Sequence, residues 1–227
     1  MKVLGFAEEI IQEEEYFRKR YRKVNKRSKG FKYEKGNTNI LFSAPHATAH
    51  MRDGRVKQED AWTGGIVRCL HKVTGVHIIY STYLSVFDPN NTFDSEYKQK
   101  IASIVTRHGI DKLFDLHGMA YHDEIGRVRP HMCYGIGRRG ETIISRIDLV
   151  NDLRTIMREH GIEVFECNIL RAADERRVAQ YASSTLKIKS MQIEIREDLR
   201  NPLVKCFPNI ENFIEGLIEY VNSLKEV

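Results

Sequence analysis

Short apolar segments alternate with longer amphipathic segments along most of this 227-residue chain. Runs of β-branched and aromatic residues are typical of strands, and apolar residues repeated every three to four positions are typical of helices. This alternation indicates a single α/β domain with a mostly parallel or mixed central sheet and helices on both faces. We predict strands at 40–44, 76–81, 112–117, 132–134, 162–167 and 191–195, and helices at 60–73, 95–108, 142–159, 175–185 and 210–224.

Polar side chains occur where three of the predicted strands end. His46 directly follows the first strand, and Asp115 and His117 share one face of the third. Glu194 is flanked by isoleucines in a strand that we expect to be central, where a carboxylate without a partner is costly. Sites in parallel sheets lie at the carboxyl ends of strands, so we expect these side chains to meet at one edge.

The same residues have the chemistry of a metal site. Two neutral imidazoles and a carboxylate, with a fourth position left for water, form the open site of a catalytic Zn²⁺. His46 and His117 supply the imidazoles, and Glu59-Asp60 supplies an acid where the next helix opens. We therefore predict one zinc ion held at this edge of the sheet.

Two further acids complete the predicted site. Zinc lowers the pKa of its water to about 7 and polarises a carbonyl. Glu194 has the right chemistry to take the proton of that water as a general base and to return it to a leaving amine. Asp115 is placed to orient a ligand imidazole from outside the ligand set.

The chain carries, in order, four motifs that resemble those of the N-formylglutamate amidohydrolase family: Ser43-Ala44-Pro45-His46, an acid opening the next helix, Asp115-Leu116-His117-Gly118 and Gln192-Ile193-Glu194-Ile195. The resemblance runs over residues 38–202 and extends to zinc carboxypeptidases and cell-wall amidases. It implies a phosphorylase/hydrolase-like mixed-sheet fold, one Zn²⁺ and hydrolysis of a C–N amide bond near a carboxylate. It also implies that His46 and His117 are metal ligands and that Glu194 is the general base.

The carboxylate ligand has two candidates. The acid of the family lies three residues before a Thr or Val position, and Thr63 places it at Asp60. Helical phase instead favours Glu59, which shares a face with Trp62 and Ile66. We expect Asp60, with Glu59 as the alternative.

The segment Asp88-Pro89-Asn90-Asn91 resembles the Asp-x-Asn-Arg element of the family, which implies that Asp88 and Asn90 contact the substrate. In this chain Asn91 stands where the family's element has an arginine. An arginine at that position is suited to bind a substrate carboxylate bidentately. The candidate substitutes are Arg127, Arg129, Arg138 and Arg196. The sequence does not decide among these arginines. We expect a small acidic amide as substrate, either an N-acyl amino acid or a peptide-like compound.

Basic residues are concentrated near the N-terminus. The formal net charge is +5, yet residues 18–35 hold ten basic residues and one acid, so the rest of the chain is net negative. Residues 6–24 have the pattern of an amphipathic helix. We predict a basic helical extension at 1–36 and a catalytic domain at 37–227. A nucleic-acid-binding module acting through residues 18–35 is an alternative, but it leaves the predicted site unexplained, so we do not expect nucleic acid as a partner.

A second alternative is a dinucleotide-binding oxidoreductase. Gly135, Gly137 and Gly140 form a GxGxxG pattern between a possible strand and a helix, which is the context of a nicotinamide or flavin site. The strand before it is weak, and Arg138 within the loop is equally suited to bind an anionic substrate. No Walker A or GxSxG motif occurs.

Cysteine spacing and hydropathy favour a cytoplasmic protein. The four cysteines, Cys69, Cys133, Cys167 and Cys206, form no CxxC pair and are expected to be reduced. No apolar run approaches the roughly 20 residues of a membrane helix. The first residues turn acidic too early for a secretory signal. The oligomeric state is left open.

Overall fold

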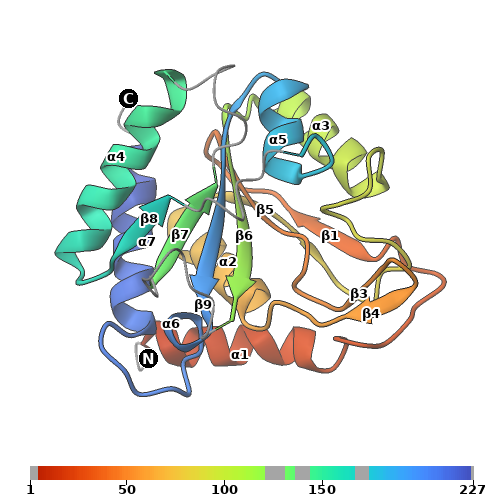
Figure 1. Cartoon of the computed structure of the whole chain (residues 1–227), viewed down its shortest axis with the longest axis horizontal. Coiled ribbons are helices and arrows are strands. Elements are labelled where there is room, and N and C mark those ends of the chain that lie inside the picture. Colours follow the sequence, from red (N-terminus) through yellow and green to blue (C-terminus); the bar gives the residue numbers. More distant parts are fainter. Residues whose placement is uncertain (1–4, 121–130, 136–143, 167–173, 226–227) are drawn as a thin grey trace.

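A seven-stranded mixed sheet runs through the molecule (Figure 1). The computed structural model describes residues 5–120, 131–135, 144–166 and 174–225, with the side chains of 144–147 excepted. In spatial order the strands are β1 (Phe31–Glu34), β5 (His77–Ser81), β2 (Ile40–Ala44), β6 (Lys112–Met119), β9 (Lys189–Arg196), β7 (Met132–Gly135) and β8 (Val164–Glu166). The predicted α/β class with a mixed sheet is confirmed.

The four central strands are parallel, and this places their carboxyl ends together. β2 pairs in parallel with β5 and β6, and β6 pairs in parallel with β9, with His117 opposite Glu194 in the register. β1 is antiparallel to β5, and β7 is antiparallel to β9 but parallel to β8. Every residue of β2 and β5 is buried, as expected for strands covered on both faces.

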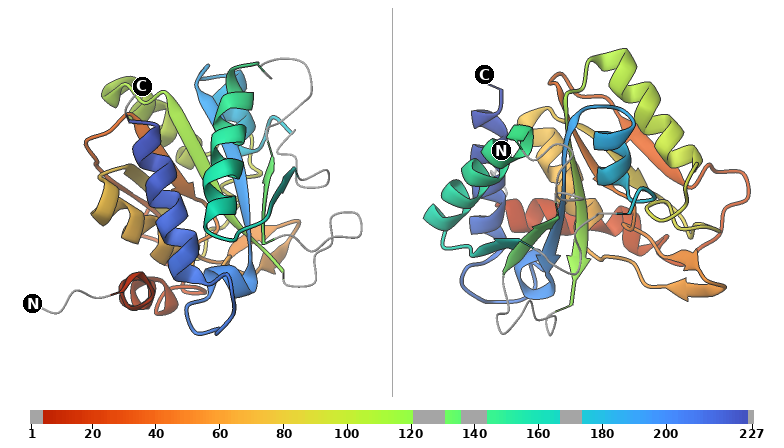
Figure 2. Two further views of the ribbon diagram at one scale, coloured as in Figure 1. Left: turned by 90° about the vertical axis from the view of Figure 1, so that its left-hand side faces the viewer. Right: turned by 45° about the horizontal axis from the view of Figure 1, so that its top comes forward.

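Helices cover both faces of the sheet (Figures 1 and 2). One apolar cluster joins the sheet to α1 (Phe6–Arg18), α2 (Thr63–Thr74), α4 (Ile144–Glu159) and α7 (Ile210–Ser223). A smaller cluster joins the opposite face to α3 (Glu96–His108) and α5 (Val178–Ser184). The short α6 (Glu197–Arg200) follows β9, and a separate hairpin pairs β3 (His50–Arg52) with β4 (Arg55–Lys57).

Local sequence sets several of these boundaries. The Ser95 side chain accepts from the Lys98 N–H and caps the start of α3, and Gly109, with φ of 62°, follows its last residue. Asp53 and Gly54 have φ of 52° and 72° and form the tight turn of the β3–β4 hairpin.

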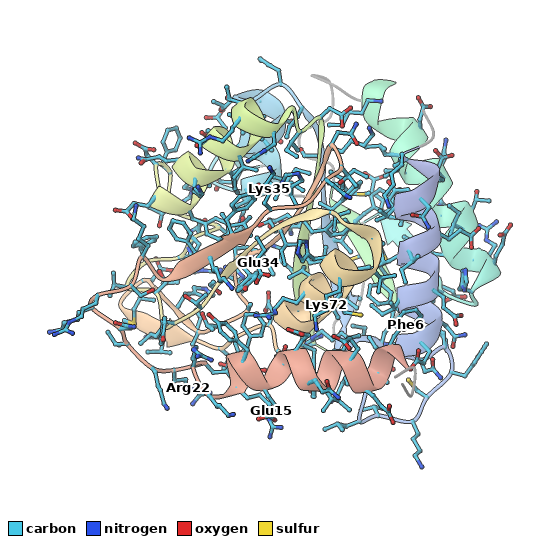
Figure 3. All side chains as sticks on the ribbon, turned by 180° about the vertical axis from the view of Figure 1, so that it is seen from behind. Phe6, Glu15, Arg22, Glu34, Lys35 and Lys72 are labelled. Carbon is cyan, nitrogen blue, oxygen red and sulfur yellow. The ribbon has the colours of Figure 1, made fainter. Side chains whose placement is uncertain are left out.

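The amphipathic helix predicted at 6–24 is present as α1, which ends at Arg18, and it packs against α2. Ile10 and Phe17 are fully buried, and a Cβ added at Gly64 would lie 2.5 Å from the Phe17 ring. Glycine at this position therefore allows α1 and α2 to pack closely. Figure 3 shows Glu15 and Arg22 on the outer side of this segment, away from the sheet.

Four elements were not predicted from sequence: β1, the two strands of the hairpin and α6. The described cysteines, Cys69, Cys133 and Cys206, form no disulfide, and Cys167 lies outside the described residues. Within the described part of the chain, no helix has the length and apolar character needed to span a membrane.

Candidate metal site

Three predicted ligands converge at the carboxyl edge of the sheet. His46 lies two residues beyond β2, His117 lies near the end of β6, and Asp60 lies three residues before α2. The Nδ1 atoms of His46 and His117 are 3.2 Å apart. Asp60 Oδ2 lies 3.3 Å from the first and 3.2 Å from the second. Three residues distant in sequence thus present one ligand atom each to the same point.

These separations match a tetrahedral zinc site. Zinc bonds of 2.0–2.2 Å in tetrahedral geometry hold neighbouring ligand atoms about 3.3 Å apart. Both imidazoles are nearly inaccessible, at 5% exposed for His46 and 3% for His117. Two imidazole lone pairs and a carboxylate facing one another at this distance repel unless a cation or protons lie between them. The donor set therefore fits Zn²⁺.

The other nitrogen of each imidazole is held by a buried carboxylate. His46 Nε2 lies 2.8 Å from Asp88 Oδ1, and His117 Nε2 lies 2.9 Å from Asp115 Oδ2. In the tautomer with a proton on each Nε2, these carboxylates accept the hydrogen bonds from Nε2, and each Nδ1 has a lone pair for a metal. Carboxylates commonly orient metal-binding histidines in this way. Asp115, which was predicted to orient a ligand imidazole, is the carboxylate beside His117 Nε2, and its orienting role stays a prediction.

Charges around the site alter its pKa values. Burial lowers the pKa of His46, but hydrogen bonds to Asp60 and Asp88 outweigh this and raise it. Burial likewise lowers the pKa of His117, while Asp115 and Asp60 raise it well above its usual value. Burial raises the pKa of Asp60, but its hydrogen bonds with the two histidines bring it well below the usual range. Asp60 is therefore an anion, as a metal ligand must be.

The backbone before α2 explains why Asp60, and not Glu59, faces the histidines. The helix begins at Thr63, so helical phase does not apply to residues 59 and 60. The Asp60 N–H donates to the His46 carbonyl at 2.8 Å, which fixes Asp60 beside that loop. Glu59 instead has its carboxylate 3.9 Å from Arg22.

Trp62 has a left-handed backbone with φ of 75°, which is strained for a bulky residue. Its N–H donates to Glu14 Oε1 at 2.7 Å, and the Gly65 N–H donates to Glu14 Oε2 at 2.8 Å. Glu14 is fully buried and belongs to α1. The start of α2, and with it the Asp60 segment, is thus held by the N-terminal helix.

Glu194 lies on β9 beside His117. It is 5% exposed, and its Oε1 accepts from the Gln192 side chain at 2.7 Å. Burial has the largest effect on the pKa of His117 and lowers it. Asp115 and Asp60 raise this pKa, and the negative charge of Glu194 adds a smaller increase. The sheet register therefore brings the predicted base next to His117, at the same end of the sheet as the candidate ligands.

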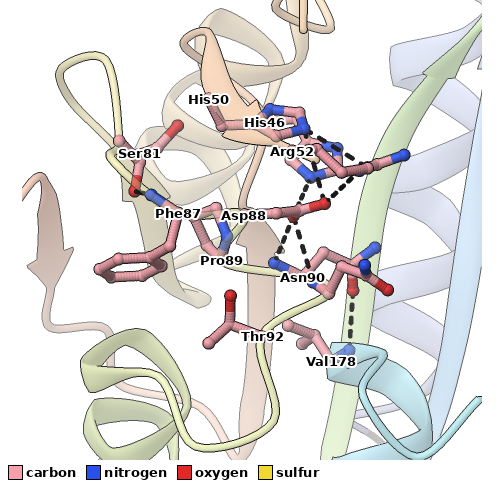
Figure 4. A network of polar contacts seen from close by, with 12 residues as sticks. His46, His50, Arg52, Ser81, Phe87, Asp88, Pro89, Asn90, Thr92 and Val178 are labelled. Carbon is pink, nitrogen blue, oxygen red and sulfur yellow. Dashed lines mark hydrogen bonds and ion pairs between the residues drawn. The ribbon is translucent and has the colours of Figure 1, made fainter. Parts of the chain in front are cut away.

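The segment after β5 supports His46 from behind (Figure 4). Asp88 Oδ1 accepts from the backbone N–H groups of Asn90 and Asn91 at 2.9 and 3.1 Å, which is the geometry of an Asx turn. The Asn90 side chain accepts from the Val178 N–H at 2.8 Å and lies 3.3 Å from His117 Nε2. Asp88 and Asn90 are buried behind the candidate ligands, and substrate contact by them stays a prediction.

Lys98 of α3 binds the backbone of this segment through its side chain. It is 1% exposed, and its Nζ donates to the carbonyls of Asn90, Thr92 and Arg176. Burial lowers its pKa to about 8.

A neighbouring cluster, His46, His50 and Asp88, is better explained by hydrogen bonding than by a second metal. Its 2.8 Å contact between His46 and Asp88 is that of a hydrogen bond. The Arg52 Nε donates to the other oxygen of Asp88 at 2.6 Å and supplies the positive charge that this carboxylate needs. His50 stacks on His46 with ring centroids 4.0 Å apart, and burial lowers its pKa to about 3.

Most of the candidate substrate-binding arginines lie outside the described residues: Arg127, Arg129 and Arg138. Arg196 is described, and its guanidinium bonds to both oxygens of Asp198 at 2.6 and 2.9 Å. Of the GxGxxG pattern, Gly135 ends β7, and Gly137 and Gly140 are outside the described part.

Several residues that contact the site or its supporting segments were not identified from sequence: Glu14, His50, Arg52 and Lys98. Two of them had a detectable signal. Glu14 and Lys98 each occupy a position on the apolar face of an amphipathic helix, where a charged residue needs a buried partner.

Comparison with known proteins confirms the resemblance at the level of the fold. No protein-family model and no curated protein matches the sequence. Among solved structures, the N-formylglutamate amidohydrolase from Ralstonia eutropha JMP134 superposes with a TM-score of 0.63 at 16% identity, covering 88% of this chain and 98% of that one. A bacteriophage poly-gamma-glutamate hydrolase gives 0.54 at 14% identity, covering 86% and 89%. YNDL in a zinc-free apo form gives 0.55 at 16% identity, covering 88% and 93%.

Proposed function

We propose that this protein is a zinc-dependent amidohydrolase that cleaves a C–N amide bond in a small acidic substrate. The observation that carries the proposal is the convergence of His46 Nδ1, His117 Nδ1 and Asp60 Oδ2 at mutual distances of 3.2–3.3 Å. The names of two proteins with the same fold support the substrate class, because both refer to amides of glutamate. An N-acyl amino acid or a γ-glutamyl compound is therefore the proposed substrate.

The described residues divide the chemistry among themselves. When bound, Zn²⁺ supplies a Lewis acid that polarises the amide carbonyl and makes water more acidic. Glu194 accepts the proton of the attacking water and returns it to the leaving amine. Asp88 and Asp115 accept from the Nε2–H groups of the two histidines and hold the rings in the tautomer that binds metal. The arginine that would bind a substrate carboxylate is proposed to be one of the four candidates named from sequence.

The Glu194→Gln variant tests the proposed general base. Glutamine keeps the shape of the side chain but cannot accept the proton, so hydrolysis should fall by about 100-fold or more. Bound zinc should stay at the wild-type level, because Glu194 is not a proposed ligand. Hydrolysis is measured on formyl-, acetyl- and γ-glutamyl-substituted glutamates, with zinc measured in the same samples.

The control is Glu197→Gln, three residues further on and exposed. This variant should keep full activity. Near-full activity of Glu194→Gln would exclude Glu194 as the base. A zinc-loaded wild-type protein that hydrolyses none of these amides would contradict the proposed substrate class.

A further inference from the structure

Arg200 is a buried arginine at the end of α6, with only 8% of its surface exposed. Its guanidinium donates to three backbone carbonyls. Nε donates to Ala61 O at 3.0 Å, and Nη1 donates to both Met119 O and Ile195 O at 2.8 Å. One side chain therefore links the segment before α2, the end of β6 and the end of β9.

The three carbonyls belong to residues that adjoin the proposed site. One follows Asp60 directly, one follows Glu194 directly, and the third lies two residues beyond His117. β6 and β9 are already paired in register, but the Asp60 segment belongs to no strand of the sheet. Arg200 joins this segment to the strands that carry the other site residues.

Gly118 is the position that makes room for this guanidinium. A Cβ added to Gly118 would lie 2.7 Å from Arg200 Cζ and 2.9 Å from its Nε. Gly118 lies within β6 and has no left-handed backbone conformation, so space rather than φ requires glycine here. The glycine after His117 is thus explained by a side chain from another element.

The charge of Arg200 is suited to this place. Burial lowers its pKa, and the nearby carboxylate of Asp60 is the largest opposing influence, followed by Glu197 and Glu194. A guanidinium stays protonated at physiological pH and offers donors in a fixed plane, whereas a lysine offers a compact charge on a flexible stem. Arg200 can therefore satisfy three carbonyls in different directions beside two site carboxylates.

We infer that Arg200 is a positioning residue of the proposed metal site. Its guanidinium holds the Asp60 segment against the ends of β6 and β9 at the spacing that brings the three ligand atoms together. The inference rests on the proposed function, because the spacing that it explains is that of a zinc site.

The test measures zinc affinity by competition with a chelating dye, and the unfolding temperature of the metal-free protein. Arg200→Lys and Arg200→Met should each weaken zinc binding by about tenfold or more, the range seen when supporting partners of metal ligands are lost. The control is Arg68→Met, which removes a half-buried arginine of α2 paired with Glu13. This control should lower the unfolding temperature and leave zinc affinity unchanged.

Gly118→Ala perturbs the same contact with Arg200 still present, and it serves if the Arg200 variants do not fold. It should also weaken zinc binding by about tenfold. In an Arg200→Ala background the added methyl group meets neither the guanidinium nor its stem, so Gly118→Ala should cause little further loss of affinity or of stability.

The inference alone would be overturned if the Arg200 and Gly118 variants bound zinc with wild-type affinity. Additive losses of zinc affinity in the double variant would overturn it in the same way. A wild-type protein that binds no zinc would overturn the proposed function as well, so the two failures are distinguishable.

Discussion

At the scale of single residues, Glu59 and Asp60 are adjacent but have different partners. Asp60 Oδ2 lies within 3.3 Å of both candidate imidazoles, whereas Glu59 faces Arg22. The backbone hydrogen bond from Asp60 to the His46 carbonyl sets this orientation. A difference of one position in sequence therefore decides which carboxylate faces the two imidazoles.

Asp60→Asn should abolish tight zinc binding, and Glu59→Gln should preserve it. The amide of asparagine is neutral and is a weaker ligand for zinc than a carboxylate. The substitution therefore leaves the two imidazoles without an anionic ligand beside them. Affinity should fall by more than the roughly 10- to 100-fold that loss of a supporting partner costs. Titration of both variants with zinc measures the difference, and the opposite ranking would assign the ligand to Glu59.

The site residues on strands were predictable because their positions depend on the alternation of strands and helices. His46, His117 and Glu194 follow or end strands whose parallel pairing brings them together. The supporting residues were not predictable to the same degree. The hydrogen bonds described for Arg200 go to backbone carbonyls, two of them in segments distant in sequence, and no local pattern reports such contacts. Glu14 could have been found, because it fills the gap between Ile10 and Phe17 on an apolar helix face.

At the scale of elements, strongly periodic segments were predicted and short charged ones were not. The strands of the hairpin hold three residues each and gain their pairing from the Asp53-Gly54 turn. All three residues of β4 are exposed, so no apolar pattern marks it. The helix expected from residue 60 begins at Thr63, since a left-handed Trp62 precedes it.

The contact between α1 and α2 predicts a specific pH dependence of stability. Burial raises the pKa of Glu14 from 4.5 to about 7, although hydrogen bonds from Tyr21 and from two backbone N–H groups oppose the rise. A carboxyl whose pKa is higher in the folded state stabilises the fold fully below its unfolded pKa. This stabilisation is lost as the pH rises through the folded pKa. At about 1.4 kcal/mol per pKa unit, the loss is roughly 3 kcal/mol.

Glu14→Gln should remove this pH dependence. Its unfolding free energy relative to wild type should therefore improve as the pH rises from about 5 to about 8. Denaturant unfolding at several pH values measures the effect. Glu15→Gln is the control, because Glu15 lies next along α1 and pairs at the surface with Arg18. A constant difference between wild type and Glu14→Gln across this range would contradict the raised pKa.

At the scale of the whole molecule, the N-terminal segment lies within the fold that carries the site. In Figure 1, α1 runs along the lower edge of the molecule, toward which the arrowheads of β6 and β9 point. Backbone hydrogen bonds also connect Tyr21 to Ala49 and Lys23 to Leu84, both at 2.9 Å. These contacts reach the loops that carry His46 and Asp88.

Deletion of residues 1–36 should therefore prevent cooperative folding. It removes β1 and the buried side chains of Ile10 and Phe17, each worth roughly 1.5–3 kcal/mol of burial. Typical domains have only about 5–15 kcal/mol to lose. Thermal unfolding followed by circular dichroism measures the result, with deletion of residues 1–4 as the control. If the deletion protein unfolded at the wild-type temperature, residues 37–227 would form an independent domain. This is the division that the sequence analysis predicts.

The central claim is that His46, Asp60 and His117 hold one zinc ion, and metal analysis of the purified protein tests it most directly. After incubation with a zinc salt and removal of the excess, the wild-type protein should retain about one equivalent of zinc per chain. The His46→Ala, His117→Ala double variant, shown to be folded by circular dichroism, should retain none. A folded wild-type protein that remains free of metal after this treatment would contradict the account.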